Sequence, residues 1–371
     1  MNYAFHLPTK IEFGSGSIKK LGKHVLEYGH SAVLVTGQSA LSNGHVELVQ
    51  QLLELESGRL EGHILVSADP DCTQVANIVA AIKSAKPDVI IALGGGSVID
   101  AAKAAAALHQ QPSVNDWVGK TLLESMRSIP LIAIPTTAGT GSEVTKGAII
   151  YDEVRHFKSG IRGEQLYPKA ALIDPDLIIT MPQRVMQETL FDAFTHLFET
   201  YMTRRSTPLA KSLSLSGLTL LADLLKQPEL SLSNPAHRDA VMQIALFGGI
   251  NIGAVGSCLP HRLQQAMPPI SSHKVSHGCG LSSVYRAWIE EVTPYVGELK
   301  TPILKLFERN SLADIIAFVQ AKLDMPTSLS AVGYSEQHIA QMCRAISGDL
   351  SNDPIESVTE PLIERIYNNA L

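Results

Sequence analysis

The sequence is short of charge and has no basic excess, and each shortage excludes a class of protein. Only 18% of its 371 residues are charged, whereas 45% are apolar. This excludes an intrinsically disordered chain, because disorder accompanies low hydrophobicity and high charge. With 30 basic against 36 acidic residues the net charge is −6. Without a basic excess, a nucleic-acid-binding surface is not expected.

Cysteines and long apolar runs are equally scarce. The four cysteines lie far apart with no Cys-x-x-Cys pair, which favours reduced thiols in a cytosol over a disulfide framework or a sulfur metal site. No apolar run reaches the ~18–20 residues needed to cross a bilayer. Residues 1–12 lack the basic start and apolar stretch of a secretory signal. The sequence therefore predicts a cytoplasmic protein with no membrane segment.

The order of the apolar patterns predicts two domains, which fits a prior of about 100–200 residues per domain. In residues 1–182, short β-branched runs alternate with helix-like segments, which predicts an α/β Rossmann-like domain with a parallel sheet and binding sites at the carboxyl ends of its strands. In residues 183–371, long apolar-periodic stretches without strand patterns predict an all-α domain. A ligand is expected in a cleft between the two. The expected strands are 32–36, 62–66, 88–93 and 130–135, and the expected helices are 41–55, 73–83, 97–108, 183–202, 208–225, 237–255 and 287–296.

Two glycine-rich segments suggest turns between strands and helices. Gly94, Gly95 and Gly96 follow a buried strand and precede an Ala-rich helix. Glycines there let the backbone adopt positive φ and approach an anion, which the N–H groups of the helix start then bind. Ser97 and Asp100 fit a capping box. We expect a diphosphate site, with a plain tight turn as the alternative; the earlier Phe13–Ser17 segment predicts only a strand-to-helix turn capped by Ser17.

A segment rich in threonine, glycine and serine, residues 135–145, follows the strand expected at 130–135. Its small hydroxyl side chains and backbone N–H groups suit the lining of a cofactor site. It is not a P-loop, because no Gly-Lys-Ser/Thr ends it. A purely structural loop is an equally good interpretation of this segment by itself.

Carboxylate and imidazole side chains in the helical half suggest a metal site. Asp192 and His196 are four residues apart, on one helix face among apolar neighbours, and a divalent cation is one partner for such a buried charge. His261, His273 and His277 lie within seventeen residues. A Pro-Pro pair between them means that they converge only through a helix, a loop and a second helix start. Such ligands suit Zn²⁺ or Fe²⁺; a core histidine and scattered surface histidines are the alternatives.

Taken together, four segments resemble the iron-containing alcohol dehydrogenase family, whose relatives include glycerol dehydrogenase and dehydroquinate synthase. They are Gly94–Lys103, Pro135–Thr145, Asp192–His196 and His277–Gly278, and the resemblance begins at Phe13. It implies a Rossmann-like domain, a helical domain, and hydride transfer between NAD(P) and a small alcohol or aldehyde. It also implies a homodimer.

The resemblance further implies roles for individual residues. The ligands of Fe²⁺ or Zn²⁺ would be Asp192, His196, His261 and His277. The cofactor diphosphate would bind Gly94, Gly95, Gly96, Ser97 and Asp100. The rest of the cofactor would be lined by Thr136, Thr137, Thr140, Ser142 and Val144, with Lys158 at the nicotinamide ribose.

Two departures from the family pattern affect the cofactor and the proton. NAD-preferring members often carry an Asp after the first strand, whereas this chain has Gly37 with Ser39 close by, which favours NADP because no carboxylate repels a 2′-phosphate. Members also commonly have a further His four residues after the third ligand, where this chain has Gln265. His273 is then a candidate for the proton relay, or for the ligand position of His261.

Two other functions remain open at this point. One is a dehydroquinate synthase-like or glycerol dehydrogenase-like enzyme with a phosphorylated or polyol substrate, although residues 191–202 and 248–265 hold few Lys or Arg. The other is a non-enzymatic protein that binds a metal or a nucleotide.

Overall fold

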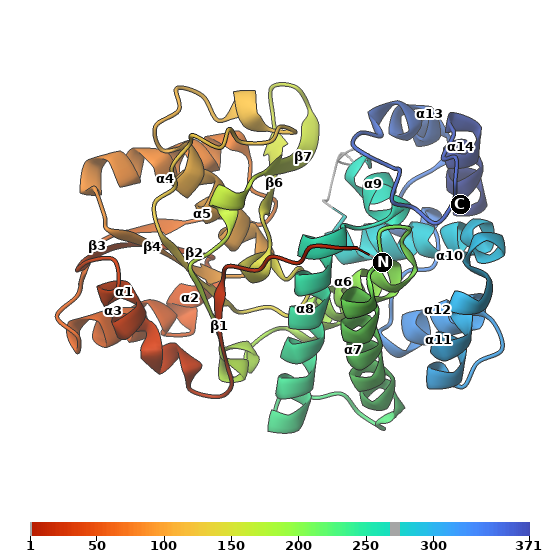
Figure 1. Cartoon of the computed structure of the whole chain (residues 1–371), viewed down its shortest axis with the longest axis horizontal. Helices are drawn as coiled ribbons and strands as arrows, with labels where there is room; N and C mark the ends of the chain where they lie inside the picture. Colours follow the sequence, from red (N-terminus) through yellow and green to blue (C-terminus); the bar gives the residue numbers. More distant parts are fainter. Residues whose placement is uncertain (1, 268–274) are drawn as a thin grey trace. The chain divides into compact units, whose positions relative to one another are not determined.

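The computed structural model describes residues 2–267 and 275–371, and these form two compact units. The sheet unit comprises His6–Met181 with Leu232–Met242, and the helical unit comprises Met1–Phe5, Pro182–Ser231 and Gln243–Leu371. The predicted succession of a parallel-sheet region and an all-helical region is confirmed (Figure 1). Segment 232–242 was not expected in the sheet unit, where Arg238 Nη2 lies 2.7 Å from Asp176 Oδ1.

A six-stranded parallel sheet forms the centre of the sheet unit, in the order β1-β8-β5-β4-β2-β3. Its four predicted strands are present, and two short strands that the sequence patterns did not reveal, β1 and β8, extend it beyond β5. A separate antiparallel pair, β6 and β7, was also not predicted. The strands are β1 Lys10–Phe13, β2 Ser31–Thr36, β3 Arg59–Leu65, β4 Val89–Gly94, β5 Leu131–Pro135, β6 Gly147–Asp152, β7 Phe157–Arg162 and β8 Ala170–Ile173.

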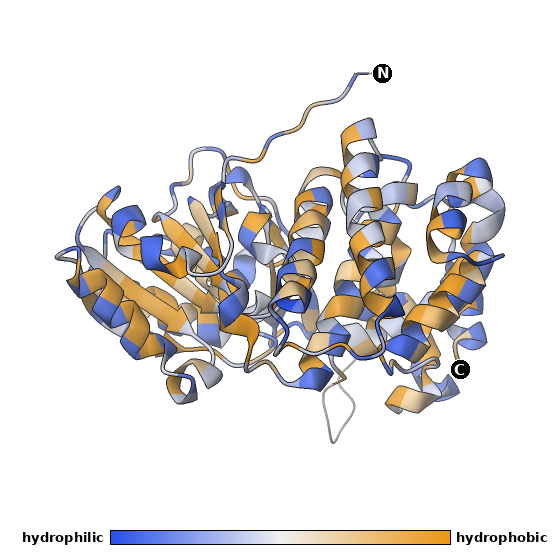
Figure 2. Cartoon of the chain, turned by 90° about the horizontal axis from the view of Figure 1, so that it is seen from below, coloured by the Kyte–Doolittle hydropathy of each residue, from blue (hydrophilic) through white to orange (hydrophobic). Residues whose placement is uncertain are grey.

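Helices cover both faces of this sheet. Along β4, Val89, Ile91 and Leu93 belong to the core shared with α1 and α3, whereas Ile90 and Ala92 belong to the core shared with α4 and α5. A strand buried on both faces is apolar throughout, which is why the run 88–93 was recognisable in the sequence and why the strands are hydrophobic in Figure 2. These helices are α1 Leu21–Leu26, α2 Ser39–Ser42, α3 His45–Glu54, α4 Cys72–Ala85 and α5 Gly96–Leu108.

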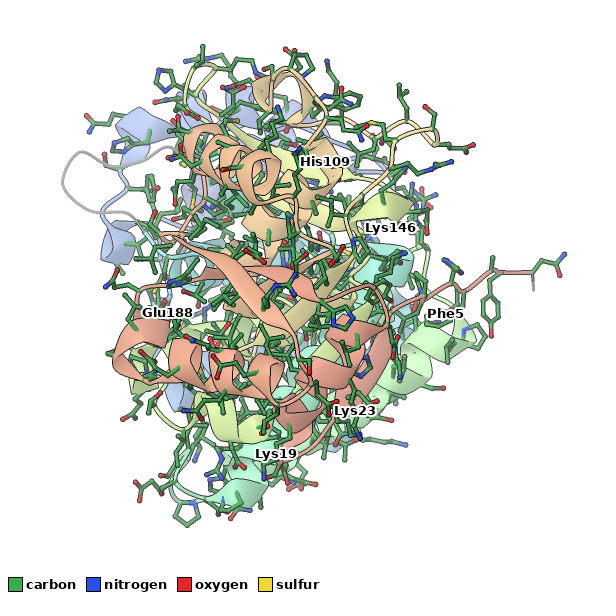
Figure 3. All side chains as sticks on the ribbon, turned by 90° about the vertical axis from the view of Figure 1, so that its left-hand side faces the viewer. Phe5, Lys19, Lys23, His109, Lys146 and Glu188 are labelled. Carbon is green, nitrogen blue, oxygen red and sulfur yellow. The ribbon has the colours of Figure 1, made fainter. Side chains whose placement is uncertain are left out.

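The outer sides of these helices are polar. Lys19, in the 3-10 segment 17–20, and Lys23, in α1, are exposed (Figure 3). Leu21 and Val25 of α1 are buried. This separation of polar and apolar side chains is the ordinary amphipathic pattern of a helix on a sheet.

Two local predictions in the sheet unit were wrong. Ser17 does not cap the turn after β1, because it is the first residue of a 3-10 helix and Gly16, with φ 77°, holds the cap position. The single helix predicted at 41–55 is divided into α2 and α3, since Gly44 has φ 70° between them. In both places a glycine in the left-handed region replaces the expected continuous or side-chain-capped helix.

The helical unit contains the long helices that the apolar periodicity predicted. Helix α10 begins ten residues before the apolar run 287–296, at the second helix start that a convergence of His261 and His277 requires, and Ser276 caps it by accepting a hydrogen bond from Cys279 N. Its helices, of which α8 begins within the sheet unit, are α6 Gln183–Met202, α7 Pro208–Lys226, α8 Pro235–Val255, α9 Leu259–Gln265, α10 His277–Val296, α11 Lys300–Phe307, α12 Leu312–Lys322, α13 Glu336–Ala345 and α14 Glu360–Asn369. The 3-10 segments among the described residues of both units are 17–20, 115–117, 142–144, 164–166, 175–178, 297–299 and 330–332.

Aromatic side chains hold α6 against α10. Phe191 and Phe194 of α6 lie 5.8 and 6.2 Å, between ring centroids, from Tyr285 of α10, and all three are fully buried. Gly278 permits the close crossing, since a Cβ there would lie 2.5 Å from the Glu188 carbonyl oxygen. The packing fixes the relative positions of two helices that carry candidate metal ligands.

Among the described residues, no single helix is both long and apolar enough to cross a membrane. By length and composition alone, the pair α8 and α9, bent by 96°, passes the same test.

Candidate metal centre and cofactor-binding loops

Four predicted ligands converge within the helical unit. Asp192 and His196 lie one turn apart on α6, His261 lies in α9, and His277 is the first residue of α10. The Nε2 atoms of His196, His261 and His277 lie 3.3, 3.5 and 3.3 Å from Asp192 Oδ1. The predicted helix at His261 and the predicted second helix start at His277 are both present, and the two residues come together. His273, the alternative ligand, lies outside the described residues.

The donor atoms of this cluster fit a divalent cation. One atom each of Asp192, His261 and His277 lies within 4.8 Å of the other two. Asp192, His196 and His261 are at most 5% exposed, whereas the His277 side chain is 32% exposed. Asp192 Oδ1 and His261 Nε2 are buried and have no hydrogen-bond partner among the described residues. Buried polar atoms normally have partners, and an ion bound to oxygen and nitrogen ligands satisfies both atoms.

Protonation equilibria in the cluster also suit a cation. Burial opposes ionisation of Asp192, but attraction to His196 and His277 outweighs it and holds the pKa of Asp192 well below its usual range. Burial lowers the pKa of His196 to about 4, so its imidazole is neutral at pH 7. Burial also opposes the charged form of His261, yet the nearby Glu199 carboxylate raises the pKa of His261 to about 9. A proton on His261 thus occupies the place that a cation would take.

Two polar residues behind the ligands were not singled out in the sequence. Glu199 Oε2 lies 3.0 Å from His261 Nδ1, and Gln264 Oε1 lies 2.6 Å from His277 Nδ1. Glu199 continues the spacing of Asp192 and His196 along the same helix face, seven and three residues on. This spacing could have identified Glu199 from the sequence, because a third polar residue on a buried helix face needs a hydrogen-bond or ion-pair partner.

The two glycine- and threonine-rich segments come together in the sheet unit. They follow neighbouring strands, since Gly94 pairs with Pro135 at the carboxyl ends of β4 and β5, and Thr136 N donates to the Gly94 carbonyl oxygen. Ligands of open α/β sheets bind at this edge. The predicted cofactor residues that are partly exposed here are Gly95, Gly96, Ser97, Asp100, Thr136, Thr137 and Thr140.

The glycines of the turn are needed for close packing rather than for an unusual backbone conformation. A Cβ on Gly96 would lie 2.5 Å from Thr140 Oγ1, and a Cβ on Gly94 would lie 2.6 Å from Val98 Cγ2. Neither these residues nor Gly95 have positive φ, so that part of the prediction was wrong. The positive φ of this region is at Gly141, 62°, before the 3-10 segment 142–144.

The predicted capping box at Ser97 and Asp100 was also wrong. Gly95 holds the cap position of α5 without a side-chain cap, and Ser97 Oγ instead accepts from Asp69 N at 3.3 Å. Asp100 Oδ2 accepts from Ile149 N at 2.8 Å on strand β6. The carboxylate is drawn to this strand, which the sequence patterns did not reveal.

A buried lysine ties the two cofactor segments together. Lys103 of α5 is 1% exposed, and its Nζ donates to the Ser142 carbonyl oxygen at 2.9 Å and to Ser142 Oγ at 3.0 Å. Ser142 Oγ in turn donates to Asp100. Ser142 and Val144 are buried, so this network shapes the loop from within, and their contact with a cofactor stays a prediction.

The remaining predicted cofactor residues lie around the same strand ends. Gly37 follows β2, the neighbour of β4 in the sheet, and Ser39 is the exposed first residue of α2. Lys158 Nζ lies 2.8 Å from Asp69 Oδ1. The backbone N–H of Asp69 donates to Ser97 Oγ. The structure thus links Lys158 to the glycine turn through Asp69.

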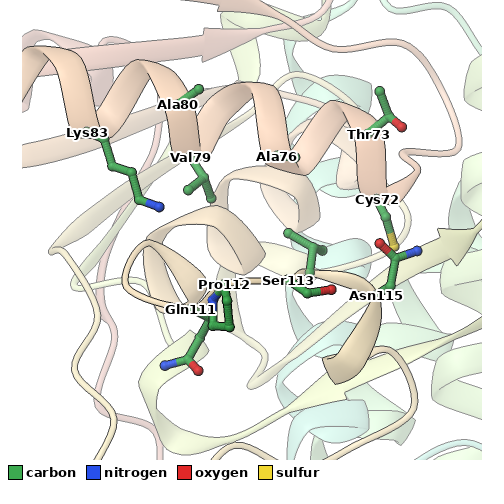
Figure 4. A pocket seen from close by; sticks show the side chains of 11 residues that line it. Cys72, Thr73, Ala76, Val79, Ala80, Lys83, Gln111, Pro112, Ser113 and Asn115 are labelled. Carbon is green, nitrogen blue, oxygen red and sulfur yellow. The ribbon is translucent and has the colours of Figure 1, made fainter.

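A second group of possible ligand atoms, Cys72, Asp152 and Glu153, has internal partners instead. Asp152 pairs with Arg155, and Glu153 accepts from the first N–H groups of α4. Burial raises the pKa of the Cys72 thiol to about 12. The pocket beside it, about 370 Å³, is lined by α4 and residues 111–115 (Figure 4). This group fixes the start of α4.

Comparison with known proteins decides the family. The model of the family "Iron-containing alcohol dehydrogenase" matches residues 8–175, and that of "Fe-containing alcohol dehydrogenase family, C-terminal" matches residues 186–371. The chain belongs to the iron-containing alcohol dehydrogenase family. The expected resemblance and fold class are confirmed, and the protein is an oxidoreductase of this family.

Relatives in this family act on different small molecules. Sulfoacetaldehyde reductase of Bilophila wadsworthia is 28% identical, and its alignment covers 100% of this chain and 99% of the reductase. NAD-dependent methanol dehydrogenase of Bacillus methanolicus is 30% identical over 74% of this chain and 72% of its own. The crystal structure of an archaeal halo-thermophilic alcohol dehydrogenase from a Red Sea brine pool has a TM-score of 0.91 and 25% identity, and covers 100% of this chain and 99% of its own.

Proposed function

We propose that this dehydrogenase interconverts a small alcohol and its aldehyde with a nicotinamide cofactor and a bound dication. The observation that carries the proposal is the approach of three imidazole nitrogens to one buried carboxylate oxygen, at 3.3–3.5 Å. The sulfoacetaldehyde reductase and methanol dehydrogenase relatives support an aldehyde or alcohol substrate.

Asp192, His196, His261 and His277 are the proposed ligands. A dication bound to them supplies Lewis-acid chemistry, which polarises a carbonyl oxygen or lowers the pKa of an alcohol hydroxyl. Asp192 contributes the negative charge, and His196 contributes a neutral imidazole because burial lowers its pKa to about 4. Nitrogen and oxygen ligands suit both Fe²⁺ and Zn²⁺, and iron is proposed first because of the family.

The sheet unit is proposed to bind the cofactor at the carboxyl ends of β4 and β5. A nicotinamide supplies the hydride chemistry itself. The N–H groups at the start of α5 would bind the diphosphate, Thr136, Thr137 and Thr140 would offer hydroxyls, and Lys158 would reach the nicotinamide ribose. Gln265 does not titrate near neutral pH, so it is not proposed as a proton relay, and a relay through His273 stays a prediction. A homodimer also stays a prediction.

NADP is the preferred cofactor in this proposal. No side chain follows β2 at Gly37, so nothing there repels a 2′-phosphate, and Ser39 is exposed beside it. An aspartate side chain at position 37 has room, since its Cβ would come no closer than 3.6 Å to Val98. The preference therefore depends on charge and is open to a direct exchange of residues.

The test is metal removal and return. Protein verified as metal-free is assayed at 340 nm with a panel of small aldehydes and NADPH or NADH, then again after anaerobic Fe²⁺ or after Zn²⁺. We expect no turnover without metal and recovery with it. Native turnover by metal-free protein would refute the role of the dication, and a metal-loaded protein inactive across the panel would favour a synthase-like or non-enzymatic function.

A further inference from the structure

Glu199 is a buried carboxylate that is not one of the four proposed ligands. It lies on α6 and is 0% exposed. Its Oε2 accepts hydrogen bonds from Cys258 N at 2.6 Å and from His261 Nδ1 at 3.0 Å. An ionised carboxylate only accepts hydrogen bonds, so the proton of the His261 ring must lie on Nδ1 in this contact.

That assignment determines which nitrogen of His261 is free. When a dication displaces the second proton of the ring, the proton that remains on Nδ1 leaves the lone pair of Nε2, which lies 3.5 Å from Asp192 Oδ1, for the ion. The second hydrogen bond, from Cys258 N, holds the residue that precedes α9. Glu199 therefore orients both the ring of His261 and the start of the helix that carries it.

The three imidazoles differ in what lies behind them. His261 Nδ1 contacts the Glu199 carboxylate, His277 Nδ1 contacts the neutral amide of Gln264 at 2.6 Å, and His196 Nδ1 is buried without a partner among the described residues. A carboxylate behind a ring makes its other nitrogen a stronger donor than an amide does. His261 is therefore the ligand whose strength depends most on a residue outside the cluster.

Charge gives a second, independent reason. Glu199 and Asp192 are two buried carboxylates, and the ion pairs seen for Glu199 among the described residues involve His261 alone, with no lysine or arginine. Buried charges require compensation. The two carboxylates that contact His261 and one dication sum to zero, so a dication bound on the far side of His261 balances the charge of Glu199.

We propose that Glu199 is a positioning residue that sets the affinity of this site for its dication, by orienting His261 and by supplying the second balancing charge. The inference rests on the proposed metal centre. Asp353 provides a matched control: it is also a fully buried carboxylate, and its Oδ2 accepts from Leu259 N at 2.8 Å and from the Trp288 indole at 3.2 Å. It holds the same helix start without contacting a ligand.

The experiment compares metal-free wild type, Glu199→Gln and Asp353→Asn. Affinity for Zn²⁺ and Co²⁺ is measured by chelator competition, and the visible spectrum of each Co²⁺ form is recorded. We expect Glu199→Gln to bind about 10- to 100-fold more weakly with shifted Co²⁺ bands. Asp353→Asn should lower the melting temperature but leave affinity and spectrum unchanged. Glu199→Asp, which retains the charge, should recover part of the affinity, and it is tested if Glu199→Gln does not fold.

The outcomes separate this inference from the proposed function. Equal affinity and identical Co²⁺ spectra for wild type and Glu199→Gln would overturn the role of Glu199 while leaving the metal centre intact. An equal loss in Asp353→Asn would also overturn it, because helix anchoring alone would then explain the effect. Failure of wild type to bind either ion would instead refute the metal centre itself.

Discussion

The buried carboxyl group of Glu143 should make the stability of the sheet unit fall as pH rises. Glu143 is 4% exposed within the loop that follows β5, and burial raises its pKa from 4.5 to about 7. A carboxyl whose folded pKa exceeds its unfolded pKa stabilises the fold fully below the unfolded value, and this stability is lost as pH rises through the folded value. The window is therefore from about pH 4.5 to about pH 7.

The size of the effect follows from the pKa shift. One pKa unit corresponds to ~1.4 kcal/mol, so integration over protonation gives a loss of about 2.5 kcal/mol in the free energy of unfolding between pH 5 and pH 8. Glu143→Gln has no such group, so its free energy of unfolding should rise relative to that of wild type as pH increases over this range. Burial lowers the pKa of Lys103, and the Glu143 charge opposes this shift in wild type alone, so the comparison includes that coupling.

The assay is urea unfolding at several pH values, followed by the fluorescence of Trp117, which packs against the core that includes α5. A Trp288→Phe background removes the other tryptophan, which lies in the helical unit. The reasoning is refuted if the difference in unfolding free energy between wild type and Glu143→Gln does not change with pH. It is equally refuted if wild type gains stability relative to the variant as pH rises.

Three further predictions concern the ligands and the glycines. His196→Ala and His277→Ala should each abolish metal retention and turnover while the circular dichroism of the sheet is unchanged; retention of one metal per chain in either would contradict the ligand assignment. Gly37→Asp should lower kcat/KM for NADP about 10- to 100-fold through like-charge repulsion, whereas Gly37→Asn should not. Equal losses of steady-state kcat/KM in the two variants would argue for a steric cause. Gly96→Ala should destabilise the sheet unit by about 1–3 kcal/mol through overpacking against Thr140, measured by urea unfolding with Gly37→Ala as the control; equal stability of the two would show that the close approach is relieved.

The sequence predicted the elements whose stabilising contacts recur regularly along the chain. Strands β2, β4 and β5 are continuous apolar runs because both of their faces are buried, and α6 matches its predicted bounds, 183–202, because its period is regular. The four-residue strands β1 and β8 carry no comparable pattern. Each becomes a strand through pairing with a partner about 160 residues away, which no local signal records.

The turn chemistry shows the same division at single residues. Gly94, Gly95 and Gly96 were recognised as a strand-to-helix turn, yet their glycine requirement comes from side chains of Val98, Thr137 and Thr140 that approach them. Asp100 has the spacing of a cap but bonds to β6. Hydrogen bonds within one turn of helix are readable from spacing, whereas bonds to a distant strand depend on where that strand folds.

For the candidate site, the sequence by itself determined the pair Asp192 and His196, because four residues of helix place two side chains on one face. Only the tertiary structure decided that His261 and His277 lie 3.5 and 3.3 Å from Asp192 Oδ1, and that Glu199 lies behind His261. The physical reason is that helix periodicity is set by backbone geometry within a few residues. The distance between helices is set instead by packing, such as that of Phe191 on Tyr285, between residues far apart in the chain.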